Sequence, residues 1–477
     1  MTDVVIIGAG IAGLAAAYEL SLRGLSFVVL ERAPRAGGVI LSEQVDGYTI
    51  DGGPDALLVQ KPDAIALCQE IGLGDRLVPT RPPRLAYIQR GGRLHALPAA
   101  SVLGIPTRVG PFLRTRLFTW RGKLRMGEEW FVPRRDDDRD ESIGAFITRR
   151  FGPEAATYLA EPLLAGIHAG DVDRLSIRAL FPRLVDAEAQ YGSLLRAFRT
   201  QASPKSAATP ESRANPKSQV PNPEGAFRSL PGGLSEMIAT LVRRIGDDHV
   251  RTRAAVAAVR GQGPFDVQTV SGESFTGRAI VLAAPAFVTS AIVRDRDGEL
   301  ARLCAEIPYA STATVALAFR RDAVAHPLNG SGFVVPRVEN AGILAASWLS
   351  SKWPHRAPDD RALVRTFLGG ARDPKALERS DAELVSHSMT ALRPLLRIAG
   401  EPIFSRVYRW ERASAQHEVG HLDRMAAIDR ALARHPGLFV TGSGFRGVGI
   451  PDCVADARAT ARAVAAFLGS SVASSYP

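Results

Sequence analysis

The residues at 8–13, Gly-Ala-Gly-Ile-Ala-Gly, form a G-x-G-x-x-G pattern near the start of the chain. The first glycine of such a turn permits a tight bend, the second lets a pyrophosphate approach the backbone, and the third lets a helix pack closely on a strand. Free N–H groups at the start of the following helix then attract phosphate. The pattern alone is weak evidence, because plain structural turns also contain it.

The residues that follow favour a dinucleotide. Seventeen residues separate Gly13 from Glu31, where a carboxylate can accept hydrogen bonds from an adenosine ribose hydroxyl. Arg35 and the pair Gly37-Gly38 come next, and an arginine fork fits phosphate oxygens. Another tight turn lies at 51–54. This extension resembles the one after the fingerprint in the amine-oxidase-like flavoproteins, which favours FAD over NAD; the alternative is an exposed turn with a solvated arginine.

A second G-x-G-x-x-G stands at 442–447, close to the C-terminus. No strand ending in Asp or Glu follows it, so it does not predict a second nucleotide fold. We expect it to direct the N-terminus of the last helix, near Val448-Gly449-Ile450, at the flavin ring, because reduced flavin carries negative charge. The alternative is a plain turn between a strand and a helix.

The residues 417–421 read His-Glu-Val-Gly-His, which satisfies the H-E-x-x-H zinc-protease pattern. That chemistry needs both histidines on one face of a helix, and Gly420 costs such a helix about 1 kcal/mol. The extended form of the motif would need Gly and His where Arg424 and Ala427 stand. We therefore predict no metal site, with a zinc hydrolase kept as a remote alternative.

The elements that must position these residues follow from hydrophobic patterning. The apolar runs 4–7 and 27–30 predict buried strands on either side of an Ala-rich helix over 11–23. Ser142 is expected to cap the start of a further helix and Gly152 to end it. Ser271-Gly272 marks the turn of a hairpin between strands 265–270 and 275–282. Further helices are predicted over 234–245, over 381–392, ending before Pro394, and from the last turn to 468, and further strands over 314–319, 333–335, 363–368, 403–410 and 438–441. The Ser/Pro-rich segment 201–225 predicts a disordered loop.

Composition excludes several other classes of protein. The 477 residues are 46% hydrophobic with a net charge of +10, which excludes a wholly disordered or collagen-like chain and predicts two or three domains. The three cysteines are far apart, so we expect no disulfide and a reducing compartment. No secretory signal opens the chain, and the longest apolar stretch, 279–293, is interrupted and too short to span a bilayer. We predict a cytoplasmic protein that binds no nucleic acid, since no zinc-finger or RNP-like signature accompanies the positive charge.

Residues 101–132 interleave apolar and basic side chains. This composition is typical of an interfacial segment on anionic lipid and predicts peripheral contact with the inner face of the cell membrane. The alternative, given equal weight, is a helix packed inward with a solvated basic face.

Taken in order, the motifs resemble the oxygen-dependent, FAD-containing protoporphyrinogen oxidases over nearly the whole chain. The resemblance rests on the N-terminal fingerprint and on residues 94–98, 166–171, 175–178, 232–234, 419–421 and 447–453. It implies an α/β (α+β) fold in which a Rossmann-like FAD-binding domain is interleaved with a mixed-sheet substrate domain and a helical membrane-binding or lid region. The expected pieces are 1–80, 226–290 and 411–477 for the FAD domain, 291–410 for the substrate domain, and 81–225 for the substrate and helical region.

The resemblance also implies the reaction and the site. Protoporphyrinogen IX would lose six electrons in two-electron steps, giving hydride to flavin N5, and oxygen would reoxidise the flavin to yield hydrogen peroxide. Arg84 takes the position that pairs with a substrate propionate, Phe367 the position that packs on a pyrrole ring, and Gly166, Ala169 and Val334 line the wall. No catalytic base is assigned, because the protein chiefly orients substrate against cofactor. The non-covalent FAD site is expected to comprise Gly8, Gly10, Ile11, Ala12, Gly13, Glu31, Arg32, Arg35, Gly37, Gly38, Gly53, Pro54, Asp55, Val256, Gly442, Val448, Gly449 and Ile450. The resemblance leaves a homodimer open.

Departures from the family pattern leave the substrate open. Ala415-Gln416-His417 stands where the family has Pro-Gln-Tyr, and Ser331 and Ser347 replace larger apolar residues expected around the cavity. A more polar pocket would suit coproporphyrinogen III, which carries more carboxylates, as the alternative substrate. Further alternatives are an amine oxidase, for which Phe445 and His417 make a poor aromatic cage, a carotenoid desaturase, and a prenyl-protein escort without working flavin.

Overall fold

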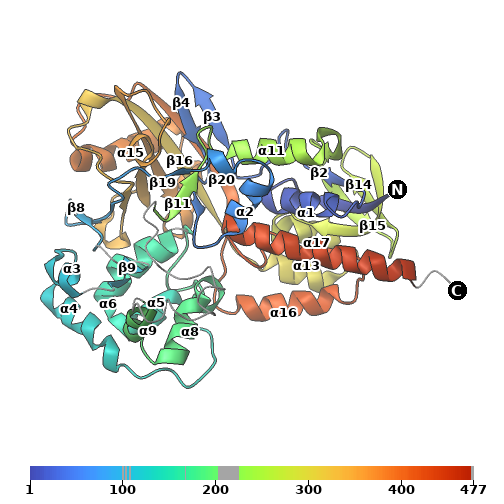
Figure 1. Ribbon diagram of the computed structural model, residues 1–477, viewed down its shortest axis with the longest axis horizontal. Coiled ribbons are helices and arrows are strands. Elements are labelled where there is room, and N and C mark those ends of the chain that lie inside the picture. The colour runs from blue at the N-terminus through green and yellow to red at the C-terminus, as the bar shows by residue number, and fades with distance from the viewer. Residues whose placement is uncertain (99–100, 103–104, 107–108, 167, 202–224, 474–477) are drawn as a thin grey trace.

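The computed structural model describes residues 1–477 except 99–100, 103–104, 107–108, 167, 202–224 and 474–477. Three parts are evident in Figure 1: a three-layer domain at the right, which holds both chain ends, a mixed-sheet domain at the upper left, and a helical region at the lower left. The segment 202–224, which is most of the predicted disordered loop, lies outside the described residues.

The three-layer domain is built on a seven-stranded sheet. Five strands run parallel in the order β12 (Val250–Arg251), β2 (Phe27–Leu30), β1 (Thr2–Ile7), β15 (Ser274–Leu282) and β21 (Leu438–Val440). β14 (Phe265–Thr269) and β13 (Val256–Arg260) continue antiparallel from the first half of β15. The sheet therefore joins segments from the beginning, middle and end of the chain.

Helices cover both faces of this sheet because alternate strand residues point to opposite sides. Val4 and Ile6 of β1 belong to a core with α1 (Ile11–Ser21), α2 (Asp63–Glu70), α11 (Ser235–Ile245) and α17 (Ile450–Ala473). Val5 and Ile7 belong to the opposite core with α12 (Ala286–Val293), α13 (Gly298–Ala305) and α16 (His421–Leu432). Burial on both faces explains why these strands read as continuous apolar runs.

The mixed-sheet domain has seven strands in the order β20 (Phe404–Ala415), β16 (Tyr309–Arg320), β19 (Arg361–Gly369), β18 (Ala345–Trp348), β17 (Gly332–Val334), β7 (Ala86–Arg90) and β8 (Arg93–Ala96). One face packs on α15 (Asp381–Leu396), which begins with a capping box between Ser380 and Glu383. The opposite face turns toward the three-layer domain, and there Tyr48 and Ile50 pack on its apolar side chains.

Short elements connect these parts. The remaining strands are β3 (Ser42–Val45), β4 (Tyr48–Asp51), β5 (Leu57–Leu58), β6 (Val78–Pro79), β9 (Ser101–Val102), β10 (Ile105–Pro106) and β11 (Phe227–Ser229). Short helical turns are α14 (Leu349–Lys352), η1 (Gly74–Arg76), η5 (Asp247–His249), η6 (Arg321–Ala323), η7 (Arg337–Glu339), η8 (Gly370–Arg372) and η9 (Ala376–Glu378). β11 lies between β5 and β6, so the chain that follows residue 224 pairs with strands from the first part of the sequence.

The helical region has its own apolar core. Its elements are α3 (Val109–Arg114), α4 (Trp120–Gly127), η2 (Glu128–Phe131), α5 (Ile143–Phe151), α6 (Pro153–Ala155), the π-helix η3 (Ala156–Ala165), α7 (Ile177–Leu180), α8 (Pro182–Tyr191) and α9 (Leu194–Gln201). The π-helix ends at the Gly166–Ala169 segment that is predicted to line the substrate wall.

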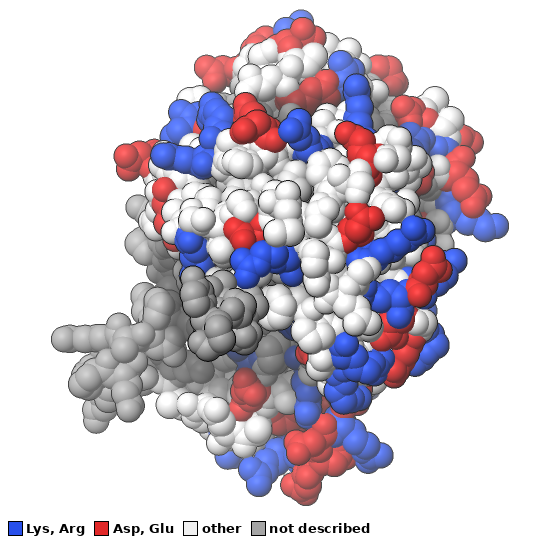
Figure 2. All heavy atoms as spheres, turned by 90° about the vertical axis from the view of Figure 1, so that its right-hand side faces the viewer, with Lys and Arg blue, Asp and Glu red and all other residues white. Residues whose placement is uncertain are grey.

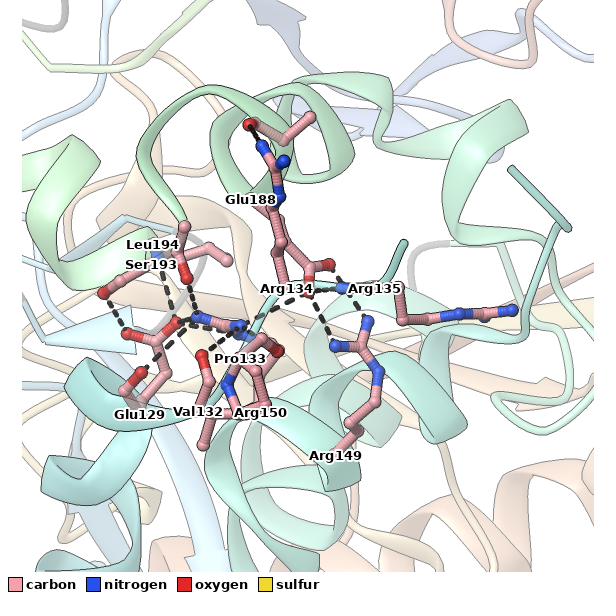
Figure 3. A network of polar contacts seen from close by, with 12 residues as sticks. Glu129, Val132, Pro133, Arg134, Arg135, Arg149, Arg150, Glu188, Ser193 and Leu194 are labelled. Atoms are coloured by element: carbon pink, nitrogen blue, oxygen red, sulfur yellow. Dashed lines mark hydrogen bonds and ion pairs between the residues drawn. The ribbon is translucent and has the colours of Figure 1, made fainter. Parts of the chain in front are cut away.

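A buried ion network holds this region together (Figure 3). Arg150 and Glu129 are both fully buried and paired, with Arg150 Nε 2.8 Å from Glu129 Oε1. Glu129 also accepts hydrogen bonds from the Ser193 hydroxyl at 2.6 Å and the Leu194 amide at 2.9 Å, at the start of α9. Arg149 pairs with Glu188 at 2.6 Å. The network thus ties η2, α5, α8 and α9 to one another.

The predicted elements have counterparts in the structure, with one clear correction. The helix 381–392 was expected to end before Pro394, but α15 continues to Leu396 with Pro394 inside it. Pro394 lies in the last turn, where a single backbone hydrogen bond is lost, and the burial of Leu392, Leu395 and Leu396 favours continuation. Elsewhere α5 is capped by Ser142 and ends at Gly152, and β14 and β15 form the hairpin around Ser271-Gly272, as predicted.

Charges on the face at the right of Figure 1 are of both signs. Figure 2 shows blue and red side chains interspersed there, with uncharged surface between them. The positive net charge is therefore not gathered on this face into the single-sign stripe that nucleic-acid binding uses. None of the helices in the described part of the chain combines the length and hydrophobicity that crossing a membrane requires.

Candidate functional site

The fingerprint turn forms between β1 and α1, as predicted. Gly8 has φ +109°, a conformation that side chains rarely adopt. A Cβ at Gly13 would overlap the carbonyl oxygen of Gly8, so only glycine lets the helix approach the turn this closely. By contrast, a Cβ at Gly10 would meet nothing within 4 Å, and no side chain caps α1 at this residue. Open space thus faces the uncapped first turn, which contains Ile11 and Ala12.

Glu31 lies at the end of β2 beside this turn. Its carboxylate is only 8% exposed and accepts hydrogen bonds from the amides of Ala9 and Ala33, each at 2.8 Å. The Glu31 backbone bonds to Arg251 and Ala254, which places the start of β13, with Val256, close by. A fixed carboxylate next to an open helix N-terminus suits the ribose and phosphates of a dinucleotide.

The loop after Glu31 folds back over the fingerprint. The Gly37 amide donates to the Ala9 carbonyl at 2.8 Å, and Gly38 lies against Gly10. Arg35 donates to the carbonyl of Gly38 at 2.7 Å and to those of residues 36 and 40 at 3.1 Å, so its guanidinium shapes this loop. Burial lowers the Arg35 pKa, which the charge of Glu31 opposes. Arg32 is exposed.

The C-terminal turn meets the N-terminal one. A Cβ at Gly442 would lie 3.5 Å from that of Ala12, and the Thr441 hydroxyl donates to Asp456 of α17 at 2.6 Å. Val448 and Gly449 lead directly into α17, which starts at Ile450. Lys61 from the first part of the chain pairs with Asp452 in the first turn of α17 at 2.7 Å. Both ends of the chain therefore converge on one place.

The two histidines of the H-E-x-x-H motif donate hydrogen bonds to carbonyl groups of the C-terminal turn 442–447. His417 lies before α16 and His421 begins it, so the motif does not form one turn of helix. The two rings stack with centroids 3.8 Å apart, and their Nε2 atoms donate to the carbonyls of Ser443 at 3.0 Å and Phe445 at 2.7 Å. Burial, with His421 nearby, lowers the His417 pKa to about 3. Within the described residues, no cluster of three or more His, Cys, Asp or Glu side chains is arranged to hold a metal.

The turn 51–55 is fixed by the mixed-sheet domain. The Gly52 carbonyl accepts from the Thr314 hydroxyl of β16 at 2.7 Å and from the Trp410 indole of β20 at 2.9 Å. Gly53 and Pro54 follow, and Gly53 lies against Val39 in the loop behind Arg35. Residues that sequence reasoning had not assigned thus hold this turn.

One row of paired residues crosses the sheet from that turn to the predicted substrate wall. Thr314 pairs with Phe367, Phe367 with Ala345, and Ala345 with Val334. Directly paired residues point to the same side of a sheet. Phe367 and Val334 therefore share the face on which Thr314 contacts the turn 51–55, and Ser347, paired with Arg365, lies on it too.

The segment with Gly166 and Ala169 adjoins this face. The Ala371 amide, two residues beyond β19, donates to the Ala169 carbonyl at 2.8 Å, and Ala169 has the unusual φ of +50°. The Ser414 hydroxyl and the Gln416 amide both donate to the His168 carbonyl, at 2.8 and 2.9 Å. Arg84 is exposed near the edge of the mixed sheet, and its Nε donates to the Thr80 carbonyl at 3.0 Å. Ala169 thus lies next to the end of β19, the strand that carries Phe367, and Arg84 lies just before β7, which pairs with β17.

A buried ion cluster lies behind the turn 51–55. Asp55 accepts from Lys352 Nζ and Trp353 Nε1, each at 2.7 Å, and pairs with Arg365 at 2.9 Å. Although burial would raise it, these cations hold the pKa of Asp55 well below its usual range. Asp51 pairs with Arg356 at 2.9 Å, both fully buried. An arginine among the apolar residues of 362–368 was the sequence sign of this cluster, and it was missed.

Comparison with known proteins identifies the family. Residues 11–465 match the profile of the flavin containing amine oxidoreductases. The chain belongs to this family. Coproporphyrinogen III oxidase of Bacillus subtilis (strain 168) is 32% identical over 464 residues, covering 96% of each chain. The mitochondrial protoporphyrinogen oxidase of Nicotiana tabacum is 28% identical over 496 residues, covering 98% of this chain and 95% of the relative.

A solved structure confirms the fold, and the family identifies the cofactor. The crystal structure of a proposed protoporphyrinogen oxidase from Exiguobacterium sp. 255-15 superposes with a TM-score of 0.84 at 30% identity, covering 98% of this chain and 99% of that one. The predicted fold class is therefore confirmed. This flavin containing amine oxidoreductase uses FAD, as predicted, and the open fingerprint turn and the fixed Glu31 carboxylate fit that group. The individual contacts of the predicted FAD residues stay predictions.

Proposed function

We propose that this oxidoreductase converts coproporphyrinogen III to coproporphyrin III, with oxygen as the electron acceptor. The observation that carries the proposal is the full-length similarity to a coproporphyrinogen III oxidase, at 32% identity, against 28% for a protoporphyrinogen oxidase. The sequence analysis placed protoporphyrinogen first and coproporphyrinogen second, and the comparisons favour the second.

The position of Ser347 in the mixed sheet supports coproporphyrinogen III as the preferred substrate. Ser347 shares a face with Phe367 and Val334, so a hydroxyl replaces an apolar side chain on the predicted wall. A substrate with more carboxylates tolerates a more polar wall, because unpaired polar groups cost less where the ligand brings partners. Arg84 would pair with a propionate, and the Phe367 ring would hold a pyrrole flat.

In this proposal the protein acts by positioning. Bound FAD supplies the two-electron acceptor for hydrogen removed from the macrocycle. Phe367, Val334 and Ala169 exclude water and press the macrocycle toward the cofactor turn, and no side chain needs to remove a proton before the hydride leaves. The rate then depends on the distance between ring and cofactor.

A rate comparison tests the proposal. The FAD-loaded protein is given coproporphyrinogen III or protoporphyrinogen IX, and porphyrin fluorescence and oxygen uptake are followed together. We expect a higher kcat/KM for coproporphyrinogen III. A higher value for protoporphyrinogen IX would restore the first alternative, and oxygen uptake only with amines would replace both by an amine oxidase.

We further propose peripheral contact with anionic membranes through the segment α3–η2. Trp120, Leu124 and Phe131 are 65%, 68% and 81% exposed, and Arg114 and Arg121 are exposed near them. Exposed aromatic and aliphatic groups next to cations suit a lipid interface. The other reading, an inward-packed helix, accounts for the buried Leu117, Phe118 and Met126 of the same segment.

Vesicle sedimentation tests this contact. The protein should pellet with anionic vesicles and less with neutral ones, and the triple variant Trp120→Ser, Leu124→Ser, Phe131→Ser should stay in the supernatant. Equal sedimentation of the variant and the unchanged protein would remove the proposal.

A further inference from the structure

We propose that Arg365 is a positioning residue, which holds Phe367 and the cofactor turn 51–55 in a fixed relation so that the substrate ring is seated at a set distance from FAD. The inference rests on the proposed function for the identity of the substrate. It concerns a side chain that no motif marks and that lies next to the predicted wall residue Phe367 on the same face of the sheet.

The polar contacts described for Arg365 end on that turn. Its guanidinium, 1% exposed, donates to the carbonyl of Asp51, to the carbonyl of Gly53 at 2.7 Å, and to the carboxylate of Asp55 at 2.9 Å. A planar fork can reach three acceptors in one plane, which an ammonium group cannot do with one geometry. Arg365 therefore fixes the backbone of the turn as well as its charge.

The other side of the guanidinium meets the predicted substrate wall. Its Cζ lies 4.7 Å from the centroid of the Phe367 ring, an attractive arrangement of cation and aromatic face. Arg365 and Phe367 are two residues apart on β19 and share a face, while the intervening Thr366 points to the α15 side, where its hydroxyl contacts Ser388. One side chain thus touches both the turn and the wall.

The surrounding cluster makes this placement rigid. Asp55 also accepts hydrogen bonds from Lys352 and Trp353. Asp51 pairs with Arg356, so both carboxylates of the turn are bound by residues outside it. Three cations face two carboxylates in a buried space, and each lost contact leaves a charge without water to replace its partner. A small shift of Arg365 would be transmitted to Phe367 and to the turn together. Misplacement of reacting groups by about 1 Å can cost about a hundredfold in rate.

Matched arginine variants test the proposal. Arg365→Lys keeps the charge and loses the fork; Arg150→Lys does the same at an equally buried site in the helical region, where Arg150 pairs with Glu129. We expect Arg365→Lys to keep stoichiometric FAD and lower kcat about tenfold or more, with KM changed less than about threefold. Arg150→Lys should lower Tm and leave kcat within about twofold.

The Phe367→Leu background separates positioning from general damage. If Arg365 acts through Phe367, the effect of Arg365→Lys on kcat should shrink to less than about twofold in that background, because coupled residues are not additive. Additive losses, or an equal kcat loss in Arg150→Lys, would overturn the proposal. Should Arg365→Lys fail to fold, Asp55→Asn, which frees one end of the fork, takes its place with the same pattern expected on a smaller scale.

A spectroscopic readout keeps the inference separate from the proposed function. Visible circular dichroism of bound FAD reports the surroundings of the flavin and needs no substrate. Arg365→Lys should change this spectrum, whereas Arg150→Lys should not; an unchanged spectrum in Arg365→Lys would contradict the role at the turn. If the unchanged protein oxidises neither porphyrinogen, the proposed function fails, and the spectra still decide the role of Arg365.

Discussion

Replacing Glu31 by Gln should weaken FAD binding without unfolding the protein. The Glu31 carboxylate holds the amides of Ala9 and Ala33, and it is predicted to accept hydrogen bonds from the ribose as well. A glutamine keeps the size and one acceptor oxygen. Its NH₂ group, however, must face one of those two amides, and two N–H donors cannot bond to each other.

The geometry sets the size of the effect. Both amide contacts are 2.8 Å long, as short as hydrogen bonds to a charged acceptor usually are. Losing the predicted hydrogen bond from the ribose to this charged group would cost about 1.5–3 kcal/mol. Since 1.4 kcal/mol is about tenfold in a binding constant, the FAD dissociation constant should rise about ten- to a hundredfold. Glu31→Ala, which removes both acceptors, should release FAD and leave a largely folded apoprotein.

Titration of apoprotein with FAD, followed by flavin fluorescence, measures this change. Glu19→Gln is the matched control: Glu19 is also 8% exposed and lies on α1, but it pairs with Arg23 and Arg458 on the helix surface. The control should lose some stability and keep its FAD affinity. An FAD affinity for Glu31→Gln within about twofold of the unchanged protein would refute the assignment of this carboxylate to the cofactor.

The remaining predictions concern acid stability, the helical region and the substrate. Burial lowers the pKa values of His417 and His168 to about 3 and about 4, so these rings stay neutral in the folded protein while the unfolded chain protonates near pH 6.5. The free energy of unfolding should therefore fall as pH drops from about 6.5 to 4, and urea unfolding of His417→Gln should show a shallower fall; an equal fall would contradict the neutral ring. Glu129→Gln should cost about 3 kcal/mol because Arg150 loses its main charged partner, and thermal unfolding of the double variant Glu129→Met, Arg150→Met should recover most of the loss; a double variant as unstable as the single one would count against the ion-pair account. Arg84→Ala should raise KM for the porphyrinogen more than it lowers kcat in steady-state assays, since a propionate contact is largely uniform binding; the opposite pattern would place Arg84 at the chemical step.

Local patterns in the sequence predicted part of the fold, including the strands β1, β2, β14 and β15. The fingerprint turn, the flanking strands and the hairpin at Ser271-Gly272 depend on residues close together in the chain, so spacing and turn chemistry suffice to locate them. The two-residue strand β12 could not be found this way. It exists because the backbone of Arg251 pairs beside β2, a contact between residues more than two hundred positions apart.

The candidate site likewise contains residues that a local motif predicts and residues that only long-range strand pairing places. The fingerprint motif requires glycine at two positions of the turn and a carboxylate beside it. The structure places Gly8, Gly13 and Glu31 as the motif requires. Thr314 and Trp410, which hold the Gly52 carbonyl, carry no motif, because their positions follow from which strands pair across the mixed sheet. Long-range pairing is set by packing of the whole domain, and a single sequence contains no direct record of it.

The start of α17 shows how distant residues decide the electrostatics of a local motif. The N-terminus of this helix, predicted to face the flavin, offers positive dipole to a cofactor that becomes negative when reduced. Asp452 in its first turn would oppose that effect, but Lys61 lies 2.7 Å from the carboxylate and cancels its charge. The stacked histidines that fix the neighbouring carbonyls of Ser443 and Phe445 are held neutral by burial and add no charge of their own. The amides of the helix are therefore a source of positive potential at this turn, and a change at Lys61, far away in sequence, should weaken it.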